Sequence, residues 1–420
     1  MEAQRITFNG NILISEDRLH FFEECFAVFG LMFYAGTFSF AADNSIAVIP
    51  ALFITLMRYG IYASSLLLLA FRFKGSLKTA LSNKWALGLV FITIASYLWS
   101  TDPAYALNSI AREFIPMFLF SLYLASKFTI KQQFKIISWT LIAVFLFCVA
   151  LVFVMPGVGV HTVGPFIGSW KGAFAAKNEF GAHSAITLIV LFMLANYAQQ
   201  RQGWAFPLFG FCFAAILISS SVTALVLSVV GLFLTVAYKK FSWMGKRSVL
   251  LGSVSTLLVS TFSYVLLTNW VDILGFFDRD PTLSTRTLIW GLVIDSKIPD
   301  RLYLGYGRGV FWATDSLTAG FERVAYHVPA HSHNGFLDLV LDIGLVGFIV
   351  FLVTFSITYL RAARLAYDFK QAAYLWPLIF LSMLVLFNTF ESYLARLVSL
   401  NWVVFMTIVF SLSRRPLSVD

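Results

Sequence analysis

Two histidines stand where a polar loop meets an apolar run, in the segment PAHSHNGFLDLVLDIGLVGF at residues 329–348. His331 and His333 are two positions apart, so they cannot share one face of a helix, and we expect a loop that delivers them to a helix beginning at Gly335. Histidine takes up a proton near neutral pH, which makes it the usual general base for a hydroxyl group. The alternative is that each histidine is simply solvated. The sequence has no HExxH or CxxC motif, so we expect no metal site.

The residues next to the histidines indicate how that loop is held. Ser332 or Asn334 is a suitable N-cap for the helix that follows. Asp338 and Asp342 are four positions apart, which places two like charges on one helix face. We expect both carboxylates to face protein or an aqueous cleft and to pair with arginines of the preceding loop.

That preceding polar segment, residues 269–334, uses arginine where the basic connections elsewhere mostly use lysine. Arginine presents a planar fork of donors that binds phosphate at two points, whereas lysine is a point charge. A phosphate-bearing ligand is one explanation, and pairing with the acidic residues of a folded loop domain is the other. The basic residues are Arg279, Arg286, Arg301, Arg308 and Arg323, with Lys297 as the one lysine.

Two short motifs single out particular arginines. The stretch STRTLIWGLVI predicts a short helix with Ser284 as its N-cap and Arg286 in its first turn, where free amides and the helix dipole already favour an anion. We therefore expect Arg286 to hold a diphosphate. In LGYGRGVFW, glycines alternate around Arg308, which allows a ligand to approach the backbone closely. This is neither a P-loop nor a dinucleotide fingerprint, and a plain turn is the alternative.

The elements that carry these groups are expected to lie in a membrane. Hydrophobic residues make up 59% of the 420 residues and charged residues 12%, against about 25% charged residues in soluble domains. Windows of about 19 residues predict about twelve transmembrane helices, so the expected fold is an all-α polytopic membrane protein. The predicted spans are 21–42, 46–71, 85–100, 111–126, 135–155, 179–198, 204–220, 222–238, 248–267, 335–360, 372–390 and 398–413.

Basic residues orient the predicted helices. Every second connection is basic, as the positive-inside rule requires of cytoplasmic connections, and Arg414 and Arg415 fall on the same side. Both termini are thus predicted to be cytoplasmic. Residues 1–267 and 335–420 are predicted to form the helices of one membrane domain, with 268–334 as a large periplasmic loop that contains short helices. The net charge of +9 then reflects topology and contact with anionic lipid, and nothing predicts nucleic-acid binding.

Several motifs, taken in chain order, resemble those of the O-antigen ligase and Wzy-type polymerase superfamily of bacterial envelope glycosyltransferases. They are STRTLIW, GYGRGVFW and HSHNGFLDLVLDIGLVG, before the last three helices. Further segments are similar to family loops: LWSTDPAYAL at 98–107, GSWKGAFAAKNEFG at 168–181 and NTFESYL at 388–394. WKGAFAAKNEFG and GVFW resemble the branch of exopolysaccharide repeat-unit polymerases.

The resemblance implies a GT-C-like architecture and transfer of a glycan from undecaprenyl pyrophosphate to a sugar hydroxyl, on the periplasmic face of the bacterial inner membrane. It implies no cofactor and no metal. The implied partners are the lipid-linked oligosaccharide, the bilayer, and a flippase, a chain-length regulator and export proteins. Arg286 matches the family arginine assigned to the pyrophosphate, and His333, directly before an asparagine, matches the histidine proposed to act on the acceptor. Further expected diphosphate or glycan contacts are Arg308, Lys171, Lys177, Arg112, His331 and Asn334.

One position departs from the family pattern. Many relatives carry a basic residue in the small loop before their equivalent of TALVLSVVG, whereas this chain has Val222 in SSSVTAL. If that basic residue helps to hold the diphosphate, we expect Lys171 or Lys177 to take its place.

Other functional classes stay open at this point. A transporter or flippase also has about twelve helices, but it usually places ionisable residues or broken helices near the membrane midplane. Here the spans are almost free of charge, with Arg58 as the main exception, and the polar residues lie in outer loops, which favours an enzyme. A non-catalytic assembly or length-control component is a third class. Within the superfamily, a polymerase joins carrier-linked glycans, whereas a ligase moves a finished glycan to lipid A-core or another acceptor. The motif likeness to exopolysaccharide repeat-unit polymerases favours a polymerase, with a ligase as the alternative.

Overall fold

The computed structural model describes most of the chain, and the described residues form an all-α bundle, as predicted. A short antiparallel hairpin of β1 (Arg5–Phe8) and β2 (Asn11–Ser15) precedes the first helix. The described residues are 5–8, 11–40, 48–198, 200–240, 286–325, 328–369, 371–394 and 398–413.

The helices before residue 241 form the first part of the bundle. They are α1 (Glu16–Tyr34), α2 (Ala51–Phe71), α3 (Phe73–Leu81), α4 (Lys84–Ala95), α5 (Pro103–Ser109), α6 (Ile115–Lys127), α7 (Ile130–Val154), α8 (Pro156–Gly159), α9 (Lys177–Asn196), α10 (Ala205–Ile218) and α11 (Val222–Lys240).

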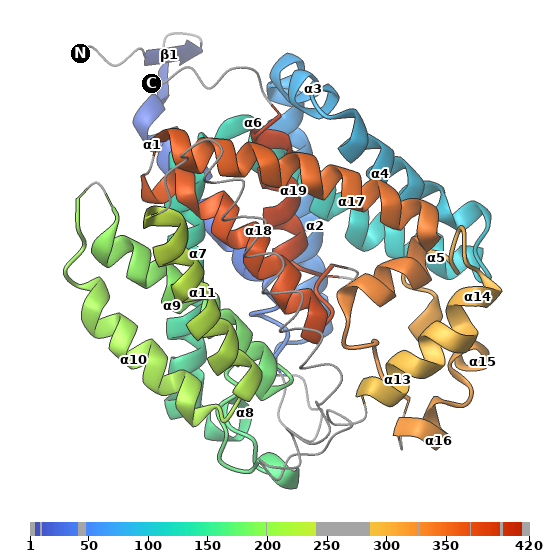
Figure 1. The fold of residues 1–420 in the computed structure, drawn as a ribbon. Coiled ribbons are helices and arrows are strands. Elements are labelled where there is room, and N and C mark those ends of the chain that lie inside the picture. Colours follow the sequence, from blue (N-terminus) through green and yellow to red (C-terminus); the bar gives the residue numbers. More distant parts are fainter. Residues whose placement is uncertain are drawn as a thin grey trace, which may run out of the picture.

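The later helices differ in length and place. In Figure 1 the short ones gather beside α5 and the beginning of the long helix that follows them. The short helices are α13 (Arg286–Leu292), α14 (Ile298–Asp300), α15 (Asp315–Thr318) and α16 (Phe321–Ala325), and the long ones are α17 (Gly335–Phe369), α18 (Ala372–Phe390) and α19 (Leu400–Ser411).

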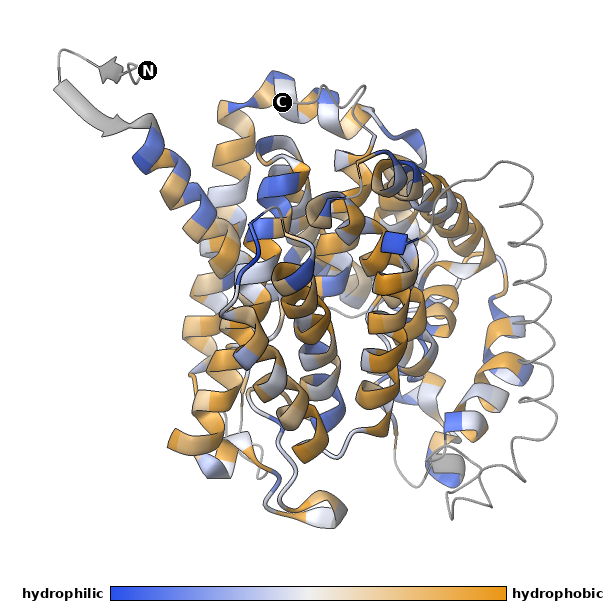
Figure 2. Ribbon diagram, turned by 60° about the vertical axis from the view of Figure 1, so that its left-hand side comes forward, coloured by the Kyte–Doolittle hydropathy of each residue, from blue (hydrophilic) through white to orange (hydrophobic). Residues whose placement is uncertain are grey.

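Six helices in the described part of the chain are long and apolar enough to cross a membrane, namely α2, α7, α9, α11, α17 and α18. Large apolar side chains on them stay exposed, such as Phe53 on α2 and Phe233 on α11, as expected of surfaces that face lipid. Figure 2 shows the long helices to be mainly hydrophobic along their length. The chain is therefore a polytopic membrane protein.

The described helices account for six or seven of the predicted spans. The segments Phe73–Leu81 and Lys84–Leu98 are bent by 92° and make a seventh span only if they count as one. The apolar helices α10 and α19 are shorter than the six, and the predicted span 248–267 lies outside the described residues. The count of about twelve stays a prediction.

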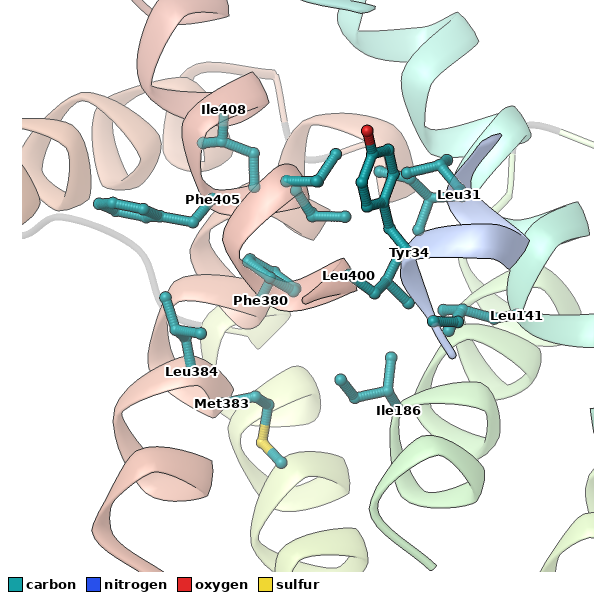
Figure 3. Packing of buried hydrophobic residues seen from close by; sticks show 14 of the residues in the cluster. Leu31, Tyr34, Leu141, Ile186, Phe380, Met383, Leu384, Leu400, Phe405 and Ile408 are labelled. Atoms are coloured by element: carbon teal, nitrogen blue, oxygen red, sulfur yellow. The ribbon is translucent and has the colours of Figure 1, made fainter. Parts of the chain in front are cut away.

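The core lies around α18 and α19. Every residue of α19 from Leu400 to Ser411 is buried, and a helix that is buried on all sides lies inside its bundle. Figure 3 shows side chains of α1, α7, α9, α18 and α19 that meet there, among them Leu31, Leu141 and Phe380. This packing holds α18, and with it the segment that follows its last residue.

One end of the bundle collects basic connections. The carboxylate of Glu23 on α1 pairs with Arg72 and with Lys127, which joins the ends of α2 and α6. Arg361 near the end of α17 donates to the hydroxyl of Ser413 at 2.7 Å. The positive-inside rule assigns such an end to the cytoplasm, and that orientation stays a prediction. The beginning of α17 and the end of α18 lie at the opposite end of the bundle.

The helix α17 is broken, although its sequence predicts one continuous span. Gly344 has a φ of 67° and interrupts the helix, a conformation that glycine adopts at low cost. The preceding loop binds backbone groups on both sides of the break: the N–H of Leu345 donates to the carbonyl of Leu302 at 2.8 Å, and the N–H of Tyr306 donates to the carbonyl of Leu341 at 2.7 Å. A break within a membrane helix is tolerated where neighbouring protein satisfies the backbone, so loop and helix form one unit.

The loop residues 286–325 have a small core of their own, which rests on α17. The hydroxyl of Tyr306 also donates to the carbonyl of Lys297 at 2.7 Å. The segment is thus folded, while the predicted domain boundary at residues 267 and 268 lies outside the described residues. The buried members of this core are Ile289, Val293, Tyr306, Phe311, Phe321 and Leu341.

Candidate functional site

Three segments meet at the end of the bundle where α17 begins. Arg286 starts α13, His333 lies in the loop before α17, and Glu391 directly follows α18. Nη2 of Arg286 lies 2.7 Å from Oε1 of Glu391, and Nδ1 of His333 lies 3.1 Å from Oε2 of the same carboxylate. The ring centroids of His331 and His333 are 4.3 Å apart. The structure thus brings the two residues predicted to be catalytic to one carboxylate.

Local hydrogen bonds hold the histidine loop. The N–H of His333 donates to Nδ1 of His331 at 3.2 Å. Asn334 caps α17, as predicted, because its Oδ1 accepts from the N–H groups of Phe336 and Leu337 at 3.0 and 3.2 Å. His333 has a φ of 57°, a backbone conformation that is strained for a residue with a side chain and is frequent at functional sites. Both histidines are therefore kept off the helix and side by side.

The turn NTFESYL holds Glu391. The N–H of Glu391 donates to the carbonyl of Phe387 at 2.9 Å, and Oδ1 of Asn388 accepts from the N–H of Tyr393 at 2.9 Å. This turn docks against the first residue of α17, Gly335, where a Cβ atom would lie 2.0 Å from Oδ1 of Asn388. Glycine at that position lets the turn lie directly beside the histidine loop.

Glu391 is ionised at the centre of this cluster. Burial alone would raise the pKa of its carboxyl group, but the hydrogen bond from His333 and the charge of Arg286 outweigh burial and lower the pKa to about 2. A carboxylate only accepts hydrogen bonds, so Nδ1 of His333 carries a proton, and in the neutral form of the ring the lone pair is on Nε2. The arrangement can therefore take a proton at Nε2 and offer the other N–H groups of Arg286 to an anion.

Asp338 ties the histidine loop to the glutamate turn. It accepts from Nε1 of Trp312 at 2.8 Å and from the N–H of Ser332 at 3.1 Å, and the hydroxyl of Ser392 also donates to it. Ser332 lies between the two histidines, and Ser392 is next to Glu391. One buried carboxylate thus braces both sides of the site.

The predicted pairing with a loop arginine is confirmed for Asp342 but not for Asp338, whose described partners are Trp312, Ser332 and Ser392. Nη1 of Arg308 lies 3.2 Å from Oδ2 of Asp342, and both side chains are buried. The N–H of Gly309 donates to the other oxygen at 2.9 Å. The expected contact of Arg308 with a diphosphate stays a prediction, and its burial against Asp342 favours a structural role.

Lys177 lies beside the loop in which this chain departs from the family pattern. Its Nζ donates to the carbonyl of Ser220 at 3.0 Å and lies 4.0 Å from the ring centroid of Phe166. Ser220 is two residues before Val222, the position where many relatives carry a basic residue. Lys177 therefore brings a cation to that loop, as the sequence suggested, and its contact with a diphosphate stays a prediction.

Two further predicted contacts lie in other segments. Lys171 is buried in the loop between α8 and α9. Arg112 is exposed on a π-helical turn, Ile110–Phe114, that precedes α6. The described contacts of Glu391 include neither of them. Ser284, the predicted N-cap, lies outside the described residues.

The cluster also contains groups that bind metals in other proteins. One ligand atom each of His331, His333 and Glu391 lies within 4.8 Å of the others, and two imidazoles with a carboxylate are common zinc ligands. The guanidinium of Arg286 already lies 2.7 Å from Glu391, and it would repel a second cation there. The expected absence of a metal stays a prediction.

Glu391 is the one residue of the cluster that the sequence does not single out. NTFESYL resembles a family loop, but nothing in the order of the chain points to its glutamate as the partner of Arg286 and His333. The available signal is that this acidic residue stands directly after the apolar run 372–390.

Part of this chain is similar in sequence to known proteins. Residues 207–352 match the family model described as O-antigen ligase, a range that contains Arg286 and His333 but not Glu391. The chain is also 26% identical over 207 residues to the exopolysaccharide production protein ExoQ of Rhizobium meliloti (strain 1021). That match covers 46% of this chain and 47% of the relative, so the chain spans about half the length of ExoQ. Both findings support the resemblance carried by the motifs: residues 207–352 are similar to the O-antigen ligase family, and about half of the chain is similar to an exopolysaccharide production protein.

Proposed function

We propose that the chain is a metal-independent glycosyltransferase that moves a glycan from undecaprenyl pyrophosphate to a sugar hydroxyl. One observation carries the proposal: Glu391 holds a guanidinium and an imidazole on its two oxygens, at 2.7 and 3.1 Å. A cation for an anionic leaving group and a base for a hydroxyl therefore stand side by side. The match to the O-antigen ligase family and to ExoQ supports polysaccharide polymerisation or ligation as the general activity.

The reaction is a single displacement at the anomeric carbon of the donor sugar. Nε2 of His333 takes the proton of the acceptor hydroxyl while the acceptor oxygen forms a bond to that carbon. The bond between the carbon and the pyrophosphate oxygen breaks, and the lipid pyrophosphate leaves with the electron pair. Arg286 binds the charge that develops on the leaving group, and Glu391 stabilises the imidazolium through Nδ1.

The site is assigned to the periplasmic face of the bacterial inner membrane. It lies at the end of the bundle opposite the basic connections that pair with Glu23 and Ser413, and the positive-inside rule assigns those connections to the cytoplasm. The exposed apolar faces of the long helices are suitable for the prenyl chain of the donor, whose head would reach Arg286.

Polymerisation of exopolysaccharide repeat units is the reaction that we favour, because the similar protein ExoQ takes part in exopolysaccharide production. Ligation of a finished glycan to lipid A-core or another acceptor is the second candidate, and the O-antigen ligase description of residues 207–352 favours it. Both reactions use the same donor and differ in the acceptor.

The experiment that tests this proposal supplies purified protein with undecaprenyl-pyrophosphate repeat units and no other acceptor. The wild-type protein should produce a ladder of glycan multiples, and His333→Ala, with an unchanged gel-filtration profile, should not. A product that appears only after lipid A-core is added would establish the ligase instead. A ladder that persists in His333→Ala would overturn the assignment of the base, and no product with either acceptor would redirect the search to transport or assembly.

A further inference from the structure

A cavity of about 610 Å³ opens beside the histidine pair. His331 lines it, and so does Ser392, the neighbour of Glu391, whereas Arg286 is not part of its wall. Small-molecule sites in proteins measure about 300–1,000 Å³, so the cavity is large enough for one or two sugar units. It therefore provides a place for a substrate next to the proposed base and apart from the proposed diphosphate contact.

Carboxyl groups and aromatic rings form the wall of this cavity. Glu113 and Asp338 supply carboxyl oxygens, while Tyr105 and Trp312 supply rings. The nearby Arg308 is not in the wall, because its side chain is buried against α17. Such a wall offers hydrogen-bond acceptors and apolar ring faces, which match the hydroxyl donors and the C–H faces of a sugar. It is a poor place for a diphosphate.

Glu113 adds an independent indication of a ligand. Its Oε2 is buried and has no hydrogen-bond partner among the described residues. Asp338, by contrast, accepts from Trp312, Ser332 and Ser392. A buried carboxyl oxygen without a donor is costly, and a sugar hydroxyl in the cavity would supply the donor.

We propose that this cavity is the subsite for the acceptor sugar and that it selects a sugar unit without negative charge, bound through Glu113 and packed against Tyr105 and Trp312. The proposal rests on the glycosyl transfer proposed above and adds the class of acceptor. A uronic acid or a phosphorylated sugar replaces a hydroxyl donor by oxygens that only accept, so Oε2 of Glu113 would stay without a donor, which disfavours such a sugar. The acceptor sugar would then lie in this cavity beside His331, while the donor diphosphate would bind Arg286, which is outside the cavity wall.

The test measures binding of the repeat-unit glycan, released from its carrier by mild acid, to the full-length protein in detergent by titration calorimetry. A second sample of the same glycan has its primary hydroxyl groups oxidised to carboxylates. The wild-type protein should bind the oxidised glycan about tenfold or more weakly than the native one. Glu113→Gln should bind the native glycan about tenfold more weakly, because an amide oxygen accepts a weaker hydrogen bond than a carboxylate. It should discriminate less against the oxidised glycan, because the amide can donate to a carboxylate.

The exposed Glu322 on α16 provides the matched control, and Glu322→Gln should bind both glycans like the wild type. The comparison of the two glycans on wild-type protein needs no variant, so misfolding of Glu113→Gln leaves the test intact. Equal affinity for the two glycans, no binding of the native glycan, or a native acceptor sugar that carries a carboxylate or phosphate would overturn the proposal. If the ladder is lost in His333→Ala but the glycans bind equally, only the subsite fails, whereas a ladder that persists in His333→Ala speaks against the proposed function itself.

Discussion

Oε2 of Glu391 lies 3.1 Å from Nδ1 of His333 across a separation of 58 residues in sequence. The two side chains meet because α18 ends beside the start of α17, and the other oxygen of the same carboxylate holds Arg286 at 2.7 Å. One carboxylate therefore sets the position of both the proposed base and the proposed cation.

Glu391→Gln should lower kcat for glycan transfer by about 10²–10⁴-fold. The amide of glutamine can donate to Nδ1 of His333, which favours the tautomer with the proton on Nε2 and removes the lone pair that takes the proton of the acceptor. Initial rates of ladder formation would measure this, with the exposed Glu322→Gln as the control. An unchanged kcat in Glu391→Gln would remove the carboxylate from the mechanism.

The charge of Glu391 should stabilise the fold over a defined range of pH. The pKa of its carboxyl group falls from the usual 4.5 to about 2 in the folded protein, so the stabilisation is fully present above about pH 4.5 and is lost as the pH falls through about 2. A shift of this size corresponds to about 3 kcal/mol. Thermal unfolding of wild type and Glu391→Gln in detergent should show a gap in midpoint that shrinks as the pH falls from about 4.5 to about 2. A gap that stayed the same over this range would assign the effect to another group.

Arg286→Lys should lower the rate of glycan transfer by about 10²–10³-fold while the protein stays folded. Lysine keeps the charge but lacks the planar fork that can bind Glu391 and a phosphate oxygen together. The matched control is Arg301→Lys, an exposed arginine of the same loop, which should be as active as the wild type. Equal activity of both variants would show that charge alone suffices at residue 286.

Gly344→Ala should destabilise the protein, because its φ is 67° and a Cβ atom there would lie 2.2 Å from the carbonyl oxygen of Tyr303. Strain of this kind costs about 1–3 kcal/mol before the clash is counted. Gly60→Ala on α2 is the control, since a Cβ atom at that residue meets nothing within 4 Å. Unfolding midpoints in detergent should fall for Gly344→Ala and not for Gly60→Ala. Equal unfolding midpoints for the two variants would show that the packing of the loop on α17 does not require the break at Gly344.

Removal of divalent metals should leave transfer unchanged. The negative charge of Glu391 is already balanced by the guanidinium of Arg286 at 2.7 Å. This cation disfavours a metal ion between the carboxylate and the two histidines. Transfer rates and metal content would be measured before and after dialysis against EDTA. Activity that is lost on dialysis and restored by zinc would instead assign a metal to His331, His333 and Glu391.

Local sequence was sufficient for the class of the protein and for part of the site. Long apolar runs and the two-residue spacing of His331 and His333 are properties of consecutive residues, and the structure has helices and a histidine loop at these places. The sequence predicted that Asp342 pairs with some arginine of the loop, because a buried charge needs an opposite charge nearby. It did not predict that this arginine is Arg308. The break at Gly344 was not, since a glycine in an apolar run looks the same whether or not another segment docks against it.

By itself, the sequence determined that this is a membrane protein that resembles the O-antigen ligase and Wzy-type superfamily, with Arg286 and His333 as its candidate catalytic residues. Only the tertiary structure decided that Glu391 joins these two residues and that Glu113 lines a cavity beside His331. The reason is physical: contacts between residues so far apart in sequence depend on how whole helices pack, and that packing arises from the combined shapes of many side chains rather than from the periodicity of any one segment.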